Sequence, residues 1–254
     1  MYFTSETTSN GVSERPFTHD GISGLLRSPI DVTRRRPLAL LGHGGGQHKS
    51  AQGLVARARC YVTRCSVAAA AIDAPGHGDR QSTEQDKQFA AGIKEQMSVD
   101  EPIDPLIARH SVSLAARAVP EWQSTLDALQ DLDHVDASGP VGFWGVSPGS
   151  AIGVPSAAAE PSITAAVFGC AGHETLAEAA PQVTVPVEFP LQWDDELVPR
   201  DSGLALSDGF ASREKTLHAN PGRHAGIPAF ELESSQRFFA PHLVRDLDAP
   251  QARR

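Results

Sequence analysis

The sequence lacks the features of several large protein classes. Among its 254 residues there are only three cysteines, Cys60, Cys65 and Cys170. They form no C-x-x-C pair, so they exclude a disulfide scaffold and indicate a reducing, cytoplasmic compartment. No apolar run approaches the roughly 18 residues that a transmembrane helix needs. The first ten residues are polar and unlike a signal peptide, and we therefore expect no membrane association.

Basic residues are also scarce relative to acidic ones. The chain has 22 Lys and Arg against 31 Asp and Glu, a formal net charge of −9. A protein that binds nucleic acid mainly through electrostatics usually carries a basic excess, so we expect no nucleic-acid partner. Hydrophobic residues make up 40% of the chain and aromatic residues 6%, an ordinary globular balance. The composition leaves the oligomeric state open.

The sequence does contain an alternation of short apolar runs and longer helical patterns. Short runs that predict strands occupy residues 37–41, 66–73, 141–144, 165–168, 187–193 and 215–218, and the first two are typical of buried strands. Helical patterns occupy residues 50–64 (with Ser50 as possible N-cap), 112–132, a segment from near Gly149, and 229–243. Before them, Asp20-Gly21 predicts a hairpin within residues 16–29. This alternation predicts an α/β fold, with a mostly parallel central sheet and helices on both faces.

Changes in composition along the chain suggest its domain boundaries. Residues 1–14 are rich in Ser, Thr and Glu and are expected to form a loose N-terminal segment. Residues 15–245 are expected to form a single domain, and residues 246–254 a C-terminal tail. Residues 81–110 interrupt the alternation of strand and helix and are rich in charged and amide side chains. We expect them to form a small helical lid over a pocket.

The most informative motif is Gly145-Val146-Ser147-Pro148-Gly149, a G-x-S-x-G. It follows an apolar strand and opens a helix, which is the context that this motif needs to present a nucleophilic serine. Small residues at positions 145 and 149 leave room for the sharp turn, and the turn exposes the serine oxygen at the strand end. Ser147 is therefore a candidate nucleophile.

A serine hydroxyl needs a base that is itself oriented by a third group. Two later loops offer these groups, and each follows a predicted strand. The first contains Asp194 and Asp195, and the second contains His224. His218 is an alternative base, but it lies at a strand end instead of in the following loop.

A second glycine-rich loop, His43-Gly44-Gly45-Gly46, follows the strand predicted at residues 37–41. Such a loop can turn backbone N–H groups towards a developing oxyanion. It matches neither of the two common phosphate-binding patterns. His43, His48 and His77 lie near glycine turns, but their spacing matches no metal motif, so we expect no metal site.

Together these motifs resemble the α/β-hydrolase superfamily, and most closely its small esterase-like and dienelactone-hydrolase-like members. The resemblance covers about residues 15–245 and includes Asp73-Ala74-Pro75-Gly76-His77-Gly78. It implies Ser147 as nucleophile, His224 as general base and acid, and Asp195 as the orienting acid, with Asp194 as the alternative. It also implies an oxyanion donor at Gly45, no cofactor, structural roles for His43 and His77, and a small-molecule substrate.

One position departs from the pattern of this superfamily. The residue after the nucleophile usually supplies an oxyanion-hole N–H, but here it is Pro148, which has none. The N–H of Gly149, the side chain of Gln47 or a lid residue could substitute. The leading hypothesis is a serine hydrolase that cleaves a small or medium carboxylic ester through an acyl-enzyme. The alternatives are a lyase, acyltransferase or cofactor-free tailoring enzyme on the same scaffold, or a non-catalytic ligand-binding module.

Overall fold

The computed structural model describes residues 1–31, 34–99 and 103–244. Their strands form a ten-stranded sheet in the order β1-β3-β4-β6-β5-β7-β8-β9-β10, with β2 also paired to β3. The strands are β1 (Tyr2–Phe3), β2 (Thr7–Ser9), β3 (Val12–His19), β4 (Ile22–Pro29), β5 (Leu38–Gly42), β6 (Ala68–Ile72), β7 (Val141–Val146), β8 (Ile163–Gly169), β9 (Val187–Gln192) and β10 (Lys215–Asn220).

From β6 to β10 every neighbouring pair is parallel, whereas β1 to β4 are antiparallel and join the sheet through β4 and β6. The register places Leu40 of β5 opposite Ala70 on one side and Phe143 on the other. This arrangement confirms the predicted α/β fold with a mostly parallel sheet.

The expectation of a loose segment over residues 1–14 is wrong. These residues form β1, β2 and the start of β3, and β2 pairs with β3 through the turn Asn10-Gly11. Both turn residues have positive φ, 49° and 77°, the same values as Asp20 and Gly21 in the predicted hairpin. Asn-Gly is a strong signal for this turn type, and it outweighs the polar composition of the segment. The predicted C-terminal tail, residues 246–254, lies outside the described residues.

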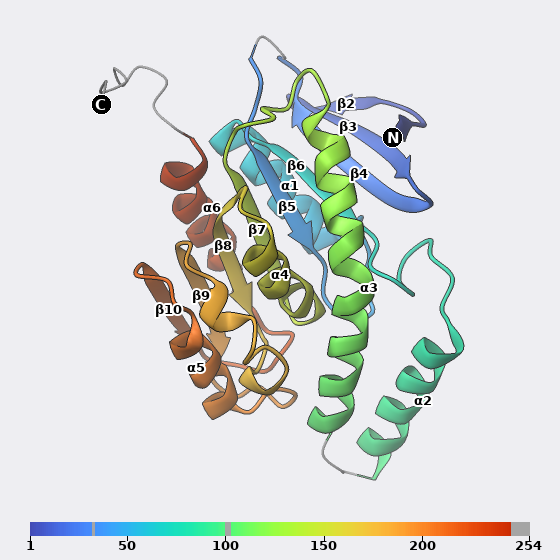
Figure 1. Ribbon diagram of the computed structural model, residues 1–254, viewed down its shortest axis with the longest axis vertical. Coiled ribbons are helices and arrows are strands. Elements are labelled where there is room, and N and C mark those ends of the chain that lie inside the picture. Colours follow the sequence, from blue (N-terminus) through green and yellow to red (C-terminus); the bar gives the residue numbers. More distant parts are fainter. Residues whose placement is uncertain (32–33, 100–102, 245–254) are drawn as a thin grey trace.

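Helices cover both faces of the sheet (Figure 1). They are α1 (Gln52–Cys65), α2 (Glu84–Ser98), α3 (Asp104–Gln130), α4 (Pro148–Ala159), α5 (Arg200–Gly209) and α6 (Phe230–Leu243), with short 3₁₀ turns η1 (His173–Thr175) and η2 (Ala180–Gln182). Alternate residues of a strand pack into two different hydrophobic cores, one on each face of the sheet. Leu38 and Leu40 pack on the side of α3 and α4, and Ala39 and Leu41 pack on the side of α1 and α6. In Figure 1, α3 and α4 lie in front of the sheet, and α2 stands beside the lower part of α3.

Most predicted helices are present, with three differences. The first begins at Gln52, and its N-cap is Ala51 without a side-chain bond, so Ser50 is not the cap. The helix predicted at 112–132 begins eight residues earlier, at Asp104. The sequence pattern gave no signal for α5. Of the described helices, none has the length and apolar character needed to cross a bilayer.

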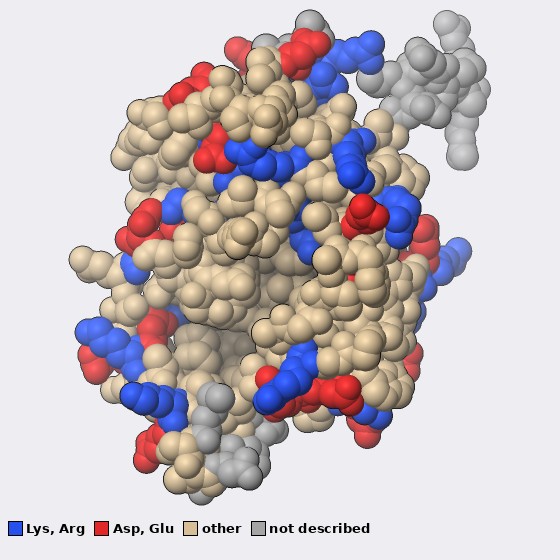
Figure 2. Space-filling model, turned by 180° about the vertical axis from the view of Figure 1, so that it is seen from behind, with Lys and Arg blue, Asp and Glu red and all other residues tan. Residues whose placement is uncertain are grey.

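Because the strands are parallel, the loops that follow β5, β7, β8, β9 and β10 emerge at one edge of the sheet. Every motif selected from the sequence lies in these loops or in the loop after β6. The fold therefore brings them to the edge where α/β proteins place their ligands. On the face seen in Figure 2, Lys and Arg side chains are interspersed with Asp and Glu.

Candidate active site

The turn between β7 and α4 holds Ser147 in a strained backbone conformation, with φ 55° and ψ −120°. Positive φ is costly for a residue with a side chain, so the surrounding structure must enforce it. Gly145 and Gly149 make the turn sterically possible. A Cβ on Gly145 would lie 2.4 Å from the carbonyl oxygen of Gly149, and one on Gly149 would lie 2.5 Å from that of Gly42.

Hydrogen bonds from β8 fix this turn. The N–H of Ser147 donates to the carbonyl of Gly169 at 2.9 Å. The hydroxyl of buried Ser150 lies 2.8 Å from the carbonyl oxygens of both Gly145 and Gly169, and it accepts the N–H of Gly169 at 2.9 Å. Ser150 was not selected from the sequence. Its position three residues after the candidate nucleophile was the available signal.

The structure brings Ser147, His224 and Asp195 together in that order. The Oγ of Ser147 lies 2.9 Å from Nε2 of His224, and Nδ1 of His224 lies 2.8 Å from Oδ2 of Asp195. A carboxylate next to Nδ1 favours the tautomer with the proton on Nδ1, which leaves Nε2 free to accept a proton from the serine. The N–H groups of Leu197 and Val198 donate to Oδ1 of Asp195 at 2.8 and 2.9 Å and orient the carboxylate.

The two alternative residues lie elsewhere. The carboxylate of Asp194 is 64% exposed and faces Arg200 and the N–H of Gly222, away from the imidazole. His218, on β10, pairs through Nδ1 with Oε2 of Glu231 on α6, at 3.0 Å. Neither residue contacts Ser147 or His224 within the described hydrogen bonds and ion pairs.

Ser147 and His224 open onto a cavity of about 510 Å³. Its far wall is apolar and comes from α2 and the region around the start of α3, through Phe89, Ile93, Ile103 and Ile107. His110 also lines it, stacked on the Phe89 ring with centroids 3.7 Å apart, and burial lowers the pKa of His110. Among the described lining residues, Glu196 is the one carboxylate and there is no Lys or Arg.

The glycine loop after β5 is held in place by His43, which is almost fully buried. Nε2 of His43 accepts the N–H of Ala74 at 3.0 Å, and Nδ1 donates to the carbonyl of Gly44 at 2.9 Å. Burial lowers the pKa of His43 to about 4, so the neutral ring joins the ends of β5 and β6. This geometry agrees with the structural role that the resemblance implies.

Asp73, at the end of β6, anchors the other end of the glycine loop. Oδ1 accepts the backbone N–H of Lys49 at 2.8 Å, and Oδ2 lies 2.6 Å from the Lys49 ammonium. Asp79 binds the same ammonium at 2.6 Å. Burial alone would lower the pKa of Lys49, but the two carboxylates outweigh it and raise the pKa above its usual value.

The two expected oxyanion donors differ in position. Gly45 lines the cavity beside Pro148, whose Cγ lies 3.6 Å from where a Cβ of Gly45 would be. In the described part of the chain, no hydrogen bond uses the N–H of Gly45. Gly149 is buried against Gly42 and is not among the residues that line the cavity.

Solved structures that are similar to this one include esterases. A cold-adapted esterase from an Arctic intertidal metagenomic library, in its PEG-bound complex, is 31% identical to the chain with a TM-score of 0.79. The match covers 96% of this chain and 100% of that one. The chain belongs to the α/β-hydrolase superfamily. No protein-family model matches this α/β hydrolase, and neither does any curated protein.

More distant structures share the fold of this α/β hydrolase. Est1E from Butyrivibrio proteoclasticus, with ferulic acid bound, is 17% identical with a TM-score of 0.67, over 89% of this chain and 98% of that one. An acetyl xylan esterase from Paenibacillus sp. R4 is 15% identical with the same TM-score, over 95% of this chain and 88% of that one. At these identities the likeness concerns the fold alone.

In this α/β hydrolase, α2 is fixed to α3 by a partly buried ion pair. The guanidinium of Arg117 lies 2.7 Å from Oδ1 of Asp86, and Asp86 also completes a capping box with Thr83 at the start of α2. Burial alone would raise the pKa of Asp86, but the hydrogen bonds from Arg117 and Thr83 outweigh it and hold the pKa well below its usual value. The segment 81–110 thus supplies part of the apolar wall, through Phe89, Ile93, Ile103 and Ile107. Their action as a lid remains a prediction.

Two clusters among the described residues have the geometry to hold a metal ion. One is Cys170, Asp195 and His224, at the site itself, where burial raises the pKa of the Cys170 thiol to about 12. The other is Glu188, His218 and Glu231, between β9, β10 and α6. In the second, Asn220 and Ser234 already donate to the two carboxylates, at 2.8 and 3.1 Å. Neither cluster includes His43, His48 or His77.

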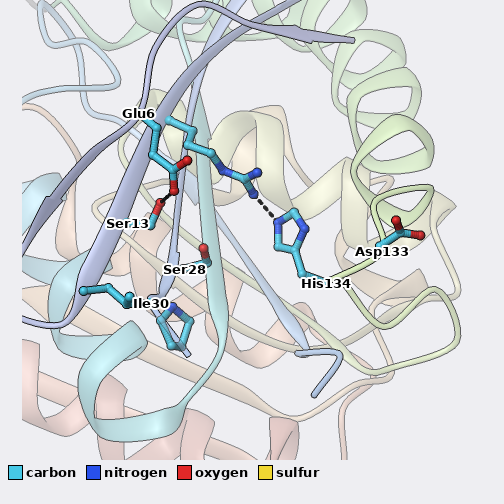
Figure 3. Close-up of a pocket in the computed structure, with 8 residues that line it drawn as sticks. Glu6, Ser13, Ser28, Ile30, Asp133 and His134 are labelled. Carbon is cyan, nitrogen blue, oxygen red and sulfur yellow. Dashed lines mark hydrogen bonds between the residues drawn. The ribbon is translucent and has the colours of Figure 1, made fainter. Parts of the chain in front are cut away.

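A second cavity, of about 360 Å³, lies at the opposite edge of the sheet (Figure 3). It is lined by Glu6 just before β2, by Ser13 and Arg15 of β3, and by His134 in the loop between α3 and β7. Its polar groups pair with one another, since Ser13 donates to Glu6 at 2.5 Å and Arg15 contacts His134. It lies at the amino ends of the parallel strands, away from Ser147.

Proposed function

We propose that this protein is a serine esterase that cleaves small or medium carboxylic esters through Ser147, His224 and Asp195. One observation carries the proposal: the Ser147 Oγ to His224 Nε2 distance of 2.9 Å, continued to Asp195 at 2.8 Å, at the mouth of a 510 Å³ cavity. The likeness to the cold-adapted esterase supports ester hydrolysis as the reaction class.

The reaction proceeds in two halves. Ser147 Oγ attacks the ester carbonyl carbon while its proton moves to Nε2 of His224, and the imidazolium is stabilised by Asp195. The tetrahedral intermediate collapses, the alcohol leaves with the proton from Nε2, and the acyl group remains on Ser147. Water then attacks the acyl-enzyme by the same steps and releases the acid. The N–H of Gly45 is the proposed donor to the oxyanion, and no metal or cofactor takes part.

The cavity wall determines which acids fit. Phe89, Ile93, Ile103 and Ile107 present apolar surface to the acyl group, which favours uncharged acyl chains by burial. A substrate with a second carboxylate finds no cation on the described wall and faces Glu196. We therefore propose esters of uncharged acids as substrates.

A panel of p-nitrophenyl esters of increasing chain length tests this function, with Ser147→Ala as the inactive variant and Ser138→Ala, an exposed serine, as the matched control. The proposal requires turnover that disappears in Ser147→Ala and is unchanged in Ser138→Ala. Equal turnover in wild type and Ser147→Ala, or none with any ester, would contradict it.

Pro148 is the reason for a second candidate function, in which the same residues catalyse the reaction of an acyltransferase, a lyase or a tailoring enzyme. Its ring occupies the place of the usual donor, which disfavours a tetrahedral intermediate and so favours the lyase or tailoring reaction, whereas acyl transfer needs the same intermediate as hydrolysis. The products decide between these reactions. Hydrolysis releases one acid for each alcohol, whereas transfer to an added alcohol yields a new ester at the expense of the acid.

A further inference from the structure

The oxyanion hole of this protein lacks one of its usual donors. Pro148 occupies the first position of α4, directly after Ser147, and lines the cavity. Proline has no N–H, so at this place the cavity wall is an apolar ring. Ester hydrolysis still requires donors for the developing negative charge, because this stabilisation is usually the largest single contribution to catalysis.

Several backbone N–H groups near Ser147 are already bonded or lie outside the cavity. The N–H of Ser147 is bonded to the carbonyl of Gly169, and the N–H of Gly44 is bonded to Oε1 of Gln47 at 3.3 Å. The N–H of Gln47 is bonded to the carbonyl of Gly44 at 3.2 Å. Gly149 does not line the cavity and is buried against the carbonyl of Gly42. The N–H groups of Gly45 and Gly46 have no acceptor in the described hydrogen bonds, and of these two glycines Gly45 is the one beside Pro148.

The side chain of Gln47 does have free donors. Its Oε1 accepts the N–H of Gly44, and this fixes the orientation of the amide, because an N–H can only face the oxygen end. The Nε2 end therefore carries two N–H groups, and in the described part of the chain no acceptor is bonded to them. Gln47 lines the same cavity as Gly45 and Pro148, and it is exposed. Its donors are available to an acceptor that arrives with the substrate.

We infer that the Nε2 amide of Gln47 is the second oxyanion donor, acting with the N–H of Gly45 in place of the N–H that Pro148 lacks. The inference rests on the proposed esterase function. The turn that closes from Gln47 to Gly44 holds the amide next to Gly45, and the buried clamps at His43 and Lys49 hold the loop from both sides. A side-chain N–H of Gln47 thus replaces a backbone N–H as a donor to the oxyanion.

Steady-state hydrolysis of p-nitrophenyl butyrate tests this, in Gln47→Ala and Gln47→Glu. Gln47→Glu retains an oxygen for the N–H of Gly44 and loses the donors, so it separates donation from loop structure. Both variants should lose about tenfold or more in kcat with little change in KM, because an oxyanion forms only after binding. Gln52→Ala, an exposed glutamine on α1 outside the cavity, is the matched control and should keep wild-type kcat.

A double-mutant cycle with Pro148→Ala identifies the cause of the loss. This change restores the backbone N–H at position 148, so Gln47→Ala should cost less than about threefold in that background. The inference is overturned if both Gln47 variants stay within about twofold of wild type, which would leave the N–H of Gly46 as the second donor. It is also overturned if the loss is equally large with Pro148→Ala. An inactive wild type would instead contradict the proposed esterase function.

Discussion

Acid should destabilise the protein through the buried ring of His43. Burial lowers the pKa of His43 to about 4, from an ordinary 6.5. As the pH falls, the unfolded chain therefore binds the proton first. The stability contributed by the neutral ring is present above about pH 6.5 and is lost as the pH falls towards about 4. The shift of about 2.5 units corresponds to about 3 kcal/mol in total, of which about 2 kcal/mol is lost between pH 7 and pH 5.

Urea unfolding at pH 7, 6 and 5 measures this loss, with His43→Gln as the reference because it has no titrating ring. The glutamine oxygen can still accept the N–H of Ala74, so the variant should fold. Other titrating groups are common to both proteins and cancel in the comparison. The free energy of unfolding of wild type should fall by about 2 kcal/mol more than that of the variant. A difference below about 0.5 kcal/mol would refute the argument.

Three further changes test other parts of the account. Asp195→Asn should lower kcat about 10⁴-fold because the imidazole loses its productive tautomer, whereas Asp194→Asn should stay within about twofold. A smaller effect at position 195 than at 194 would reverse the assignment. Asp86→Asn should lower the free energy of unfolding by about 1–3 kcal/mol in urea, through its bonds to Arg117; no change would show that the pair does not hold α2. Phe89→Ala should raise kcat/KM for an octanoyl ester about tenfold relative to a butyryl ester. An unchanged ratio would show that Phe89 does not limit the length of the acyl chain.

The sequence predicted the parts of the site that follow strand ends. Ser147 and Asp195 each follow an apolar run, His224 lies in the loop after the last predicted strand, and parallel strands carry their ends to one edge. Local patterns were therefore sufficient to place these residues together. The turn Asn10-Gly11 carried an equally local signal, but the polar composition around it favoured a loose segment. Hydrogen bonds between β2 and β3 prevailed over composition.

The rest of the site depends on contacts between residues distant in the chain. The salt bridge of Lys49 with Asp73 joins two loops 24 residues apart, and nothing in either segment alone predicts it. The apolar wall of the cavity forms because α2 packs against α3. Phe89, Ile93 and Ile107 of these helices therefore line the same cavity as Ser147. The periodicity of hydrophobic residues shows which face of a helix is apolar. It does not show which cavity that face lines.

Covalent labelling by a fluorophosphonate tests the central claim most directly, because the probe reacts only with an activated nucleophile. Intact mass followed by peptide mapping should find one phosphonyl group, on Ser147, in the wild type. His224→Ala should slow the labelling about 10³-fold or more, since the serine then has no base. Labelling at another residue, or equal labelling of wild type and Ser147→Ala, would contradict the assignment of Ser147 as the nucleophile.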